Sequence, residues 1–138
     1  MRSPHDCLIL TNNPLVRDAL GSRYEIAFFG ESSYREVLVK ARDLVYGGHG
    51  LLTHPLAGSV KPNETPYRSV VLTRSAPGLT AEHAEIIGSA VETFDKFTPR
   101  DRVLTERMLR DFRLIDYTLL CGALDVDAAA GLSILTDY

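Results

Sequence analysis

Short apolar runs alternate with longer amphipathic stretches along this chain, and turn-forming residues separate them. The continuous apolar runs predict four strands, at residues 7–11, 24–29, 50–53 and 69–73. Amphipathic stretches predict helices at residues 14–20, 34–46, 80–97 and 98–120, with a last helix that begins after Asp125 or Asp127 and ends at about residue 135.

Capping residues mark several of these predicted boundaries. Asn13 followed by Pro14 fits the N-cap and first position of a helix, and Gly21 suits its C-terminal end. Residues 98–101, Thr-Pro-Arg-Asp, give a similar start signal for the fourth helix, which Gly122 would end.

The order of these elements predicts one α/β domain over residues 1–138, with a helical C-terminal third. We expect a small doubly wound, mainly parallel sheet whose four strands lie in the order 2-1-3-4. No helix is predicted between the third and fourth strands, so the direction of the fourth strand stays open.

Composition narrows the class of protein and of partner. Hydrophobic residues make up 45% and charged residues 24% of the chain, as in an average globular domain. The net charge of −3 argues against nucleic acid as a partner. No apolar run approaches the roughly 20 residues that span a bilayer, and the N-terminal MRSPHDC lacks the apolar stretch of a signal peptide. We therefore expect a cytoplasmic protein without a membrane partner.

The cysteines and histidines give no sign of a metal or cofactor. Cys7 and Cys121 lie in apolar runs without C-x-x-C spacing, so we expect two buried small hydrophobic residues, and a redox role is less favoured. The four histidines are scattered, with no pair at metal-ligand spacing on a helix.

The polar, proline-containing segment LLTHPLAGSVKPNETPYRSVVL, residues 51–72, is the candidate site. Ligands of open α/β sheets bind beyond the carboxyl ends of strands, where the strand order reverses. In the predicted order, residues 11–14 and 53–68 form a crevice there. The helix that begins at Pro14 would point its N-terminus into this crevice and favour a small carboxylate or phosphoryl compound. The candidate ligand-binding residues are Thr11, Asn12, Asn13, His54, Gly58, Ser59, Lys61, Asn63, Glu64, Thr65, Tyr67 and Arg68.

Most of these side chains also have an ordinary structural role. His54 is the candidate catalytic residue because imidazole titrates near neutral pH, although a hydrogen bond that fixes the loop is the more common role. Ser59 is not in a G-x-S-x-G sequence, so turn capping is favoured over nucleophilic attack. Lys61 and Arg68 would supply positive charge, and Arg68 could hold an anion through its fork of donors.

The predicted helices after residue 73 carry more apolar surface than one small sheet needs. The apolar positions 114–115, 119–120 and 132–135 are the ones in question. Burial in a symmetric homodimer and burial in a thick helical layer of one monomer are equally favoured.

Three stretches of the chain resemble the GrdX family: ILTNNPLVRDAL, VLVKARDLVYGGHGLLTHP and LLTHPLAGSVKPNETPYRSVVLT. The resemblance covers about the first half closely and the helical second half only in general character. It implies a setting, because GrdX proteins are small proteins associated with the glycine, sarcosine and betaine reductase systems of amino-acid-fermenting anaerobes. The resemblance identifies no catalytic residue in this chain. The positions that match the shared motifs are Thr11, Asn12, Asn13, Pro14, His54, Pro55, Gly58, Ser59, Lys61, Pro62, Asn63, Thr65, Pro66 and Tyr67.

Three functions are consistent with these features. The first is an accessory or regulatory protein of such a reductase pathway, which binds a partner component or a small anionic metabolite; the lack of a recognisable redox centre favours it. The second is a small hydrolase or transferase with His54 as proton carrier and Asn12 or Asn13 at an oxyanion. The third is a purely structural interaction module, with Glu64, Tyr67 and Arg68 as contacts.

Overall fold

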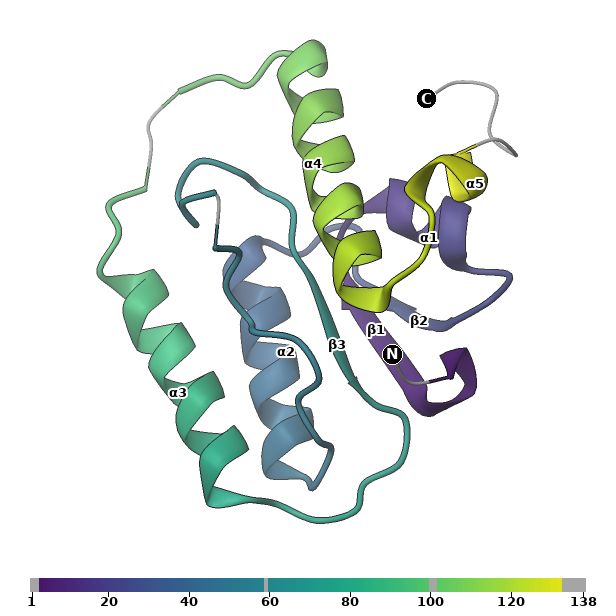
Figure 1. Ribbon diagram of the computed structural model, residues 1–138. Helices are drawn as coiled ribbons and strands as arrows, with labels where there is room; N and C mark the ends of the chain where they lie inside the picture. The colour runs from purple at the N-terminus through teal and green to yellow at the C-terminus, as the bar shows by residue number, and fades with distance from the viewer. Residues whose placement is uncertain (1–2, 59, 100–101, 133–138) are drawn as a thin grey trace.

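A computed structural model of the chain describes residues 3–58, 60–99 and 102–132 (Figure 1). The strands are β1 (Cys7–Thr11), β2 (Glu25–Phe28) and β3 (Ser69–Thr73). The helices are a short 3-10 turn (Pro4–Asp6), α1 (Pro14–Leu20), α2 (Tyr34–Tyr46), α3 (Ala81–Asp95), α4 (Glu106–Leu124) and α5 (Ala128–Leu132). The α/β class and the helical C-terminal part are as the sequence predicts.

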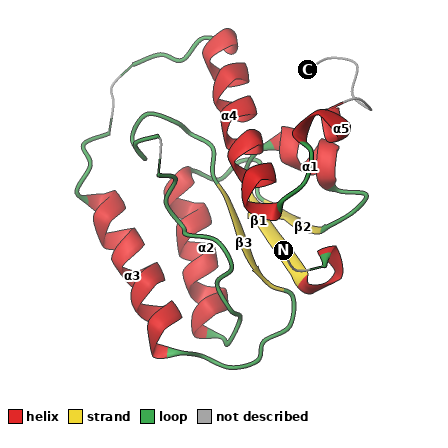
Figure 2. Cartoon of the chain, viewed as in Figure 1, coloured by secondary structure: helices red, strands yellow, loops and turns green. Residues whose placement is uncertain are grey.

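The described residues form a three-stranded sheet in the order β2-β1-β3 (Figure 2). β1 pairs in parallel with β2 and antiparallel with β3, which settles the direction that the sequence left open. Leu10 lies opposite Ala27 on one side and Val70 on the other. The sheet is therefore mixed, and β3, not residues 50–53, is the neighbour of β1.

The predicted strand at residues 50–53 is wrong, and so is the predicted order 2-1-3-4. This segment lies on the outer side of β3, where Leu51 forms a single antiparallel bridge with Leu72. The side-chain hydroxyl of Thr53 then accepts the hydrogen bond from the Val71 amide, at 3.0 Å. Since a side chain replaces the backbone acceptor that a strand would supply, the ladder ends after one bridge.

Helices cover both faces of the sheet, as the alternation of side chains along β1 requires. Cys7 and Ile9 point to one face, where they pack in a cluster with residues of α1 and α4. Leu10 points to the other face and packs with α2 and with Ile87 of α3. Figure 1 shows α2 and α3 side by side, with α4 and α1 on the opposite side of the strands.

The helix boundaries agree with the sequence where capping is local. α2 has the predicted bounds, and it begins with a capping box in which Ser33 and Glu36 bond each other's backbone amides. The predicted start of the fourth helix at residue 98 is wrong, because α4 begins after its N-cap Thr105. The helix also continues through Gly122 and ends at Leu124, and its C-cap Asp125 has a left-handed φ of 58°. Residues 133–135 of the predicted last helix lie outside the described ones.

The exposed face of α4 carries apolar side chains. Leu114, Ile115 and Leu119 are 42%, 40% and 36% exposed, whereas Leu120 is buried in the core. In the described part of the chain, no helix is long and apolar enough to cross a membrane.

The position of Thr105 yields a test of where α4 begins. Its hydroxyl accepts from the Met108 amide at 3.2 Å, so Thr105→Ala should lower the free energy of unfolding by about 1 kcal/mol in urea denaturation. Thr98→Ala is the matched control, because the bond that Thr98 makes with the described residues is to its main-chain carbonyl, from the Asn63 amide. We expect it to change stability by less than about 0.5 kcal/mol. A larger loss from Thr98→Ala than from Thr105→Ala would mean that the helix begins where the sequence suggested.

Candidate functional site

The end of β1 meets the end of the long loop that precedes β3. Because the two strands are antiparallel, residues 11–13 lie beside residues 66–69. The Thr11 and Ser69 hydroxyls are 2.7 Å apart, and the Arg68 amide donates to Asn12 Oδ1 at 2.9 Å. The two polar segments that the sequence analysis placed at one crevice are thus in direct contact, joined by buried hydrogen bonds.

Asn12 connects three segments of the chain through its side-chain amide. Its Nδ2 donates to the carbonyl oxygens of Ser32, at 2.9 Å, and of Pro66, at 2.8 Å. Its Oδ1 accepts from Arg68. The residue is only 3% exposed, and since both hydrogens and the oxygen already have main-chain partners, its role in the fold is to fix the loops.

Asn13 links α1 to α4. Its Oδ1 caps α1 by accepting from the Leu15 amide at 3.0 Å, which confirms the predicted cap. Its Nδ2 donates to the Arg113 carbonyl at 2.8 Å and to Asp116 Oδ2 at 3.0 Å. The amide that the sequence analysis directed toward a ligand therefore also holds a neighbouring helix.

Arg68 lies with its guanidinium inside the protein. Nε donates to the Pro55 carbonyl at 2.6 Å, and a terminal nitrogen donates to the His54 carbonyl at 2.7 Å. Another terminal nitrogen is 3.8 Å from Asp116 Oδ1. The fork of donors holds the beginning of the loop against its end, so the loop is rigid at both ends.

Asp116, on α4, completes this buried network. Its Oδ2 accepts from the Ser69 hydroxyl at 2.7 Å and from Asn13. Burial raises the pKa of its carboxyl, although Arg68, Asn13 and Ser69 favour the charged form. This internal carboxylate lies beside the cap of α1 and Arg68, where the sequence analysis expected the anion of a ligand.

Sequence reasoning did not identify Asp116. The available signal was its position next to Phe112, Ile115 and Leu119 on α4, because a carboxylate among the apolar positions of a helix usually has buried partners. Which partners it has depends on the packing of α4 against the ends of β1 and β3, and the sequence pattern contains no information on that contact.

A pocket of about 570 Å³ opens on the other side of the loop. Its walls are the residues before and in the first turn of α2, the loop at residues 62–67, the end of α3 and the chain that enters α4. Five of the candidate residues line it: Asn12, Asn63, Glu64, Thr65 and Tyr67. A pocket of this size is in the range that binds small molecules.

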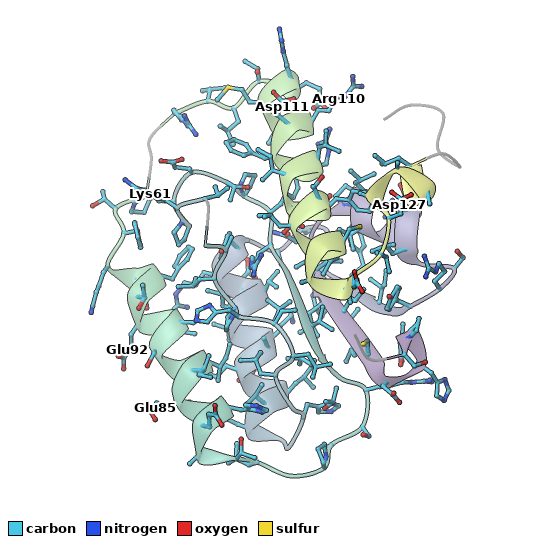
Figure 3. All side chains as sticks on the ribbon, viewed as in Figure 1. Lys61, Glu85, Glu92, Arg110, Asp111 and Asp127 are labelled. Carbon is cyan, nitrogen blue, oxygen red and sulfur yellow. The ribbon has the colours of Figure 1, made fainter. Side chains whose placement is uncertain are left out.

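His54, Gly58 and Arg68 line a different pocket, of about 190 Å³. His54 is exposed, and its Nδ1 accepts from the Leu56 amide at 3.0 Å, as expected for a residue that fixes a turn. The proposed proton carrier and Asn12 thus do not face the same pocket. Lys61 is exposed at the edge of the molecule (Figure 3) and lines neither pocket. Ser59 lies outside the described residues.

Both cysteines are buried, as predicted, and they belong to the same core cluster. Burial raises the pKa of the Cys121 thiol. No group of three or more histidine, cysteine, aspartate or glutamate side chains that could hold a metal ion occurs among residues 3–58, 60–99 and 102–132.

The buried carboxylate makes stability sensitive to substitution and to pH. Asp116→Ala removes the buried acceptor that the Ser69 hydroxyl and the Asn13 amide share and leaves Arg68 without its carboxylate, and should cost about 3 kcal/mol of unfolding free energy. Asp116→Asn keeps an acceptor oxygen in place and should stay within about 1 kcal/mol of wild type. Equal losses from both variants, measured by urea denaturation, would contradict this account.

The sign of the pH effect follows from the raised pKa of Asp116. The folded chain binds this proton more tightly than the unfolded chain, so its ionisation lowers wild-type stability as pH rises from about 4 to above the native pKa. The Asp116→Asn variant lacks that loss, and its stability relative to wild type should increase over the same range. A relative stability that falls with rising pH would mean that the native pKa is lowered.

Comparisons with known proteins agree with the resemblance of the sequence motifs. No curated protein and no solved structure matches the chain. A family model described as GrdX-like protein matches residues 8–125, which include β1 except Cys7, all of β2, β3 and α1 to α4, and the residues that line both pockets. The chain belongs to the GrdX-like family.

Proposed function

We propose that this chain is an accessory or regulatory protein of a glycine, sarcosine or betaine reductase system, and that it acts by binding. Membership of the GrdX-like family supports the reductase setting through the association that the family name carries. The observation that supports a binding role is the pocket of about 570 Å³ beside a loop fixed at both ends.

Hydrogen bonds between its walls keep the shape of this pocket constant. Asn12 holds the carbonyls of Ser32 and Pro66 on one amide group, and these two residues are on adjacent walls. The Asn63 amide donates to the Thr98 carbonyl at 2.8 Å and joins the loop to the chain beyond α3. A wall that does not have to be ordered on binding loses little conformational entropy, which favours recognition of a ligand or of a partner's side chain.

The proposed ligand carries a carboxylate or phosphoryl group, or such a group belongs to a partner component. Arg102 is the cation among the described lining residues, and it donates to the Glu64 carbonyl at 3.1 Å. Lys61 is exposed at the start of the same loop. An anionic group in the pocket would meet Arg102, and Lys61 adds positive charge on the surface next to the lining residue Pro62. We also propose that the exposed apolar face of α4 forms a homodimer interface. Sedimentation velocity measures the oligomeric state.

Binding to purified reductase components, measured by biolayer interferometry on the immobilised chain, tests the proposal. We expect saturable binding of at least one component. Lys61→Glu should weaken it about threefold or more, because a rim charge then repels. Arg110→Glu is the matched control, since Arg110 lies at the exposed upper end of α4, away from the loop (Figure 3).

The ligand part is tested in parallel by calorimetry with glycine, betaine, acetyl phosphate and inorganic phosphate. Saturable heat from one of them supports it. A folded chain that binds no reductase component and releases no heat with any of the four compounds would overturn the proposed function.

A further inference from the structure

The second half of α4 exposes a face without charged side chains. Its exposed residues are Leu114, Ile115, Thr118, Leu119, Gly122 and Ala123. Their spacing of one and three or four positions places them on one side of the helix, whereas Asp116, the charged residue of this half, is buried. Adjoining apolar side chains on the outside of a domain mark an interaction site.

Two hollows adjoin this face, and Leu119 lines both of them. A hollow of about 270 Å³ lies along the helix itself, and its walls are Leu114, Ile115, Thr118 and Leu119. The pocket of about 190 Å³ lies between Leu119, Ala123 and the first residues of the long loop. Ridges of side chains that alternate with hollows are the surface through which helices pack against each other. The shape of this face therefore suits a second helix.

Gly122 lies on the same face, and the packing of the described residues gives no reason for a glycine there. Outside its own helix, no described atom lies within 4 Å of the position that a side-chain Cβ would take. Glycine is one of the least favourable residues inside a helix. Its benefit is that the backbone of a neighbouring element can approach closely. A close crossing of two helices at this point would use that benefit.

The N-terminal end of α4 carries a net positive charge. Glu106 and Arg113 pair with each other at 2.7 Å, which leaves the exposed Arg107, Arg110 and Asp111 with a formal charge of +1. Figure 3 shows Arg110 and Asp111 at this end of the helix. The macrodipole of the helix adds partial positive charge at the same end.

The C-terminal end of α4 is negative. Asp125 and Asp127 follow the helix and are exposed. Arg23 interacts electrostatically with Tyr117 of the helix and leaves this end with a formal charge of −1. Arg107 and Asp125 are 18 positions apart, which corresponds to five helical turns, so they lie on the same side of α4. An antiparallel second copy of α4 would bring each Arg107 to the Asp125 of the other copy.

We propose that a second copy of this chain covers this face, and that the two α4 helices pack antiparallel about a two-fold axis near Thr118. The inference rests on the homodimer of the proposed function and specifies its geometry. A two-fold interface needs a self-complementary surface. Here uncharged side chains meet uncharged side chains at the centre, and the positive end of each helix meets the negative end of the other.

Sedimentation velocity of the full chain over a concentration series, up to about 1 mM, tests the inference through the dissociation constant of the dimer. Leu119→Asn should weaken the dimer about tenfold or more, because it places a polar group at the centre of the interface. Leu79→Asn is the matched control. Leu79 is 55% exposed and precedes α3, which packs on the opposite face of the sheet (Figure 1), so the dissociation constant should not change.

Gly122→Leu separates close approach from general hydrophobicity. Leucine favours a helix more than glycine does, and at this position it meets open space in the single chain. The urea midpoint of the monomer, measured below the dissociation constant, should therefore rise. The dimer should nevertheless weaken about tenfold, because the added side chain keeps the two helices apart.

Exchange of the two end charges tests the antiparallel direction. Arg107→Glu and Asp125→Lys should each weaken the dimer about threefold, and the double variant should recover the wild-type dissociation constant within about twofold. The strain of lysine at the left-handed position of Asp125 is the same in monomer and dimer, so it cancels in the dissociation constant.

A chain that stays monomeric throughout the series overturns this inference together with the homodimer, while binding of reductase components and of small ligands is measured separately. If such a monomer loses binding of a reductase component in the Leu119→Asn variant, the face belongs to that partner. A dimer that Leu119→Asn does not weaken, or that Leu79→Asn weakens equally, overturns the assignment to α4. A Gly122→Leu dimer as strong as wild type, or a double charge variant weaker than either single variant, overturns the antiparallel packing.

Discussion

The buried amide of Asn12 is the interaction on which the candidate site depends. Two main-chain segments converge at the end of β1: the turn before α2 and the end of the long loop. Asn12 bonds Ser32 in the first segment and both Pro66 and Arg68 in the second. In a buried position, an unpaired carbonyl or amide costs free energy comparable to a lost hydrogen bond. The positions of these segments are therefore coupled, and with them the shape of the pocket that they line.

A second set of buried polar groups supports the first from the other side of the sheet. Asp116 brings a carboxylate from α4 to Asn13, Ser69 and Arg68. Arg68 in turn holds the first residues of the loop through the carbonyls of His54 and Pro55. The loop is thus held to α4 and to both of its own ends, although its described residues, 53–58 and 60–68, contain no helix or strand. This explains how a long connection presents a defined wall to a ligand.

The sequence predicted the features that depend on neighbouring residues. Asn13 and Pro14, or Ser33 and Glu36, cap a helix wherever the chain places them, and the apolar runs at residues 7–11 and 69–73 form strands with those bounds. Local signals failed where a distant contact decides. Thr98 and Pro99 look like a helix start, but the Thr98 carbonyl is bonded to Asn63, and α4 begins only after Thr105.

The difference between local signals and distant contacts also explains where the predicted site and the observed site differ. The convergence of residues 11–14 with the loop was predicted from topology, and it occurs although the assumed strand order is wrong, because the antiparallel β3 also begins at the end of β1. The internal use of Arg68 and the role of Asp116 depend on partners 13 to 103 positions away, since Arg68 bonds Pro55 and His54 and Asp116, in the middle of α4, bonds Asn13 and Ser69. The division of the candidate residues between two pockets follows from those contacts.

Hydrogen exchange in an Asn12→Ala variant tests the central claim most directly. If Asn12 couples the walls of the pocket, amide exchange should accelerate together at residues 31–36 and 64–68, while Asn63→Ala, which removes the bond from the same loop to the Thr98 carbonyl, should accelerate exchange only near residues 63 and 98. Unchanged exchange at residues 31–36 in the folded Asn12→Ala variant would contradict the account.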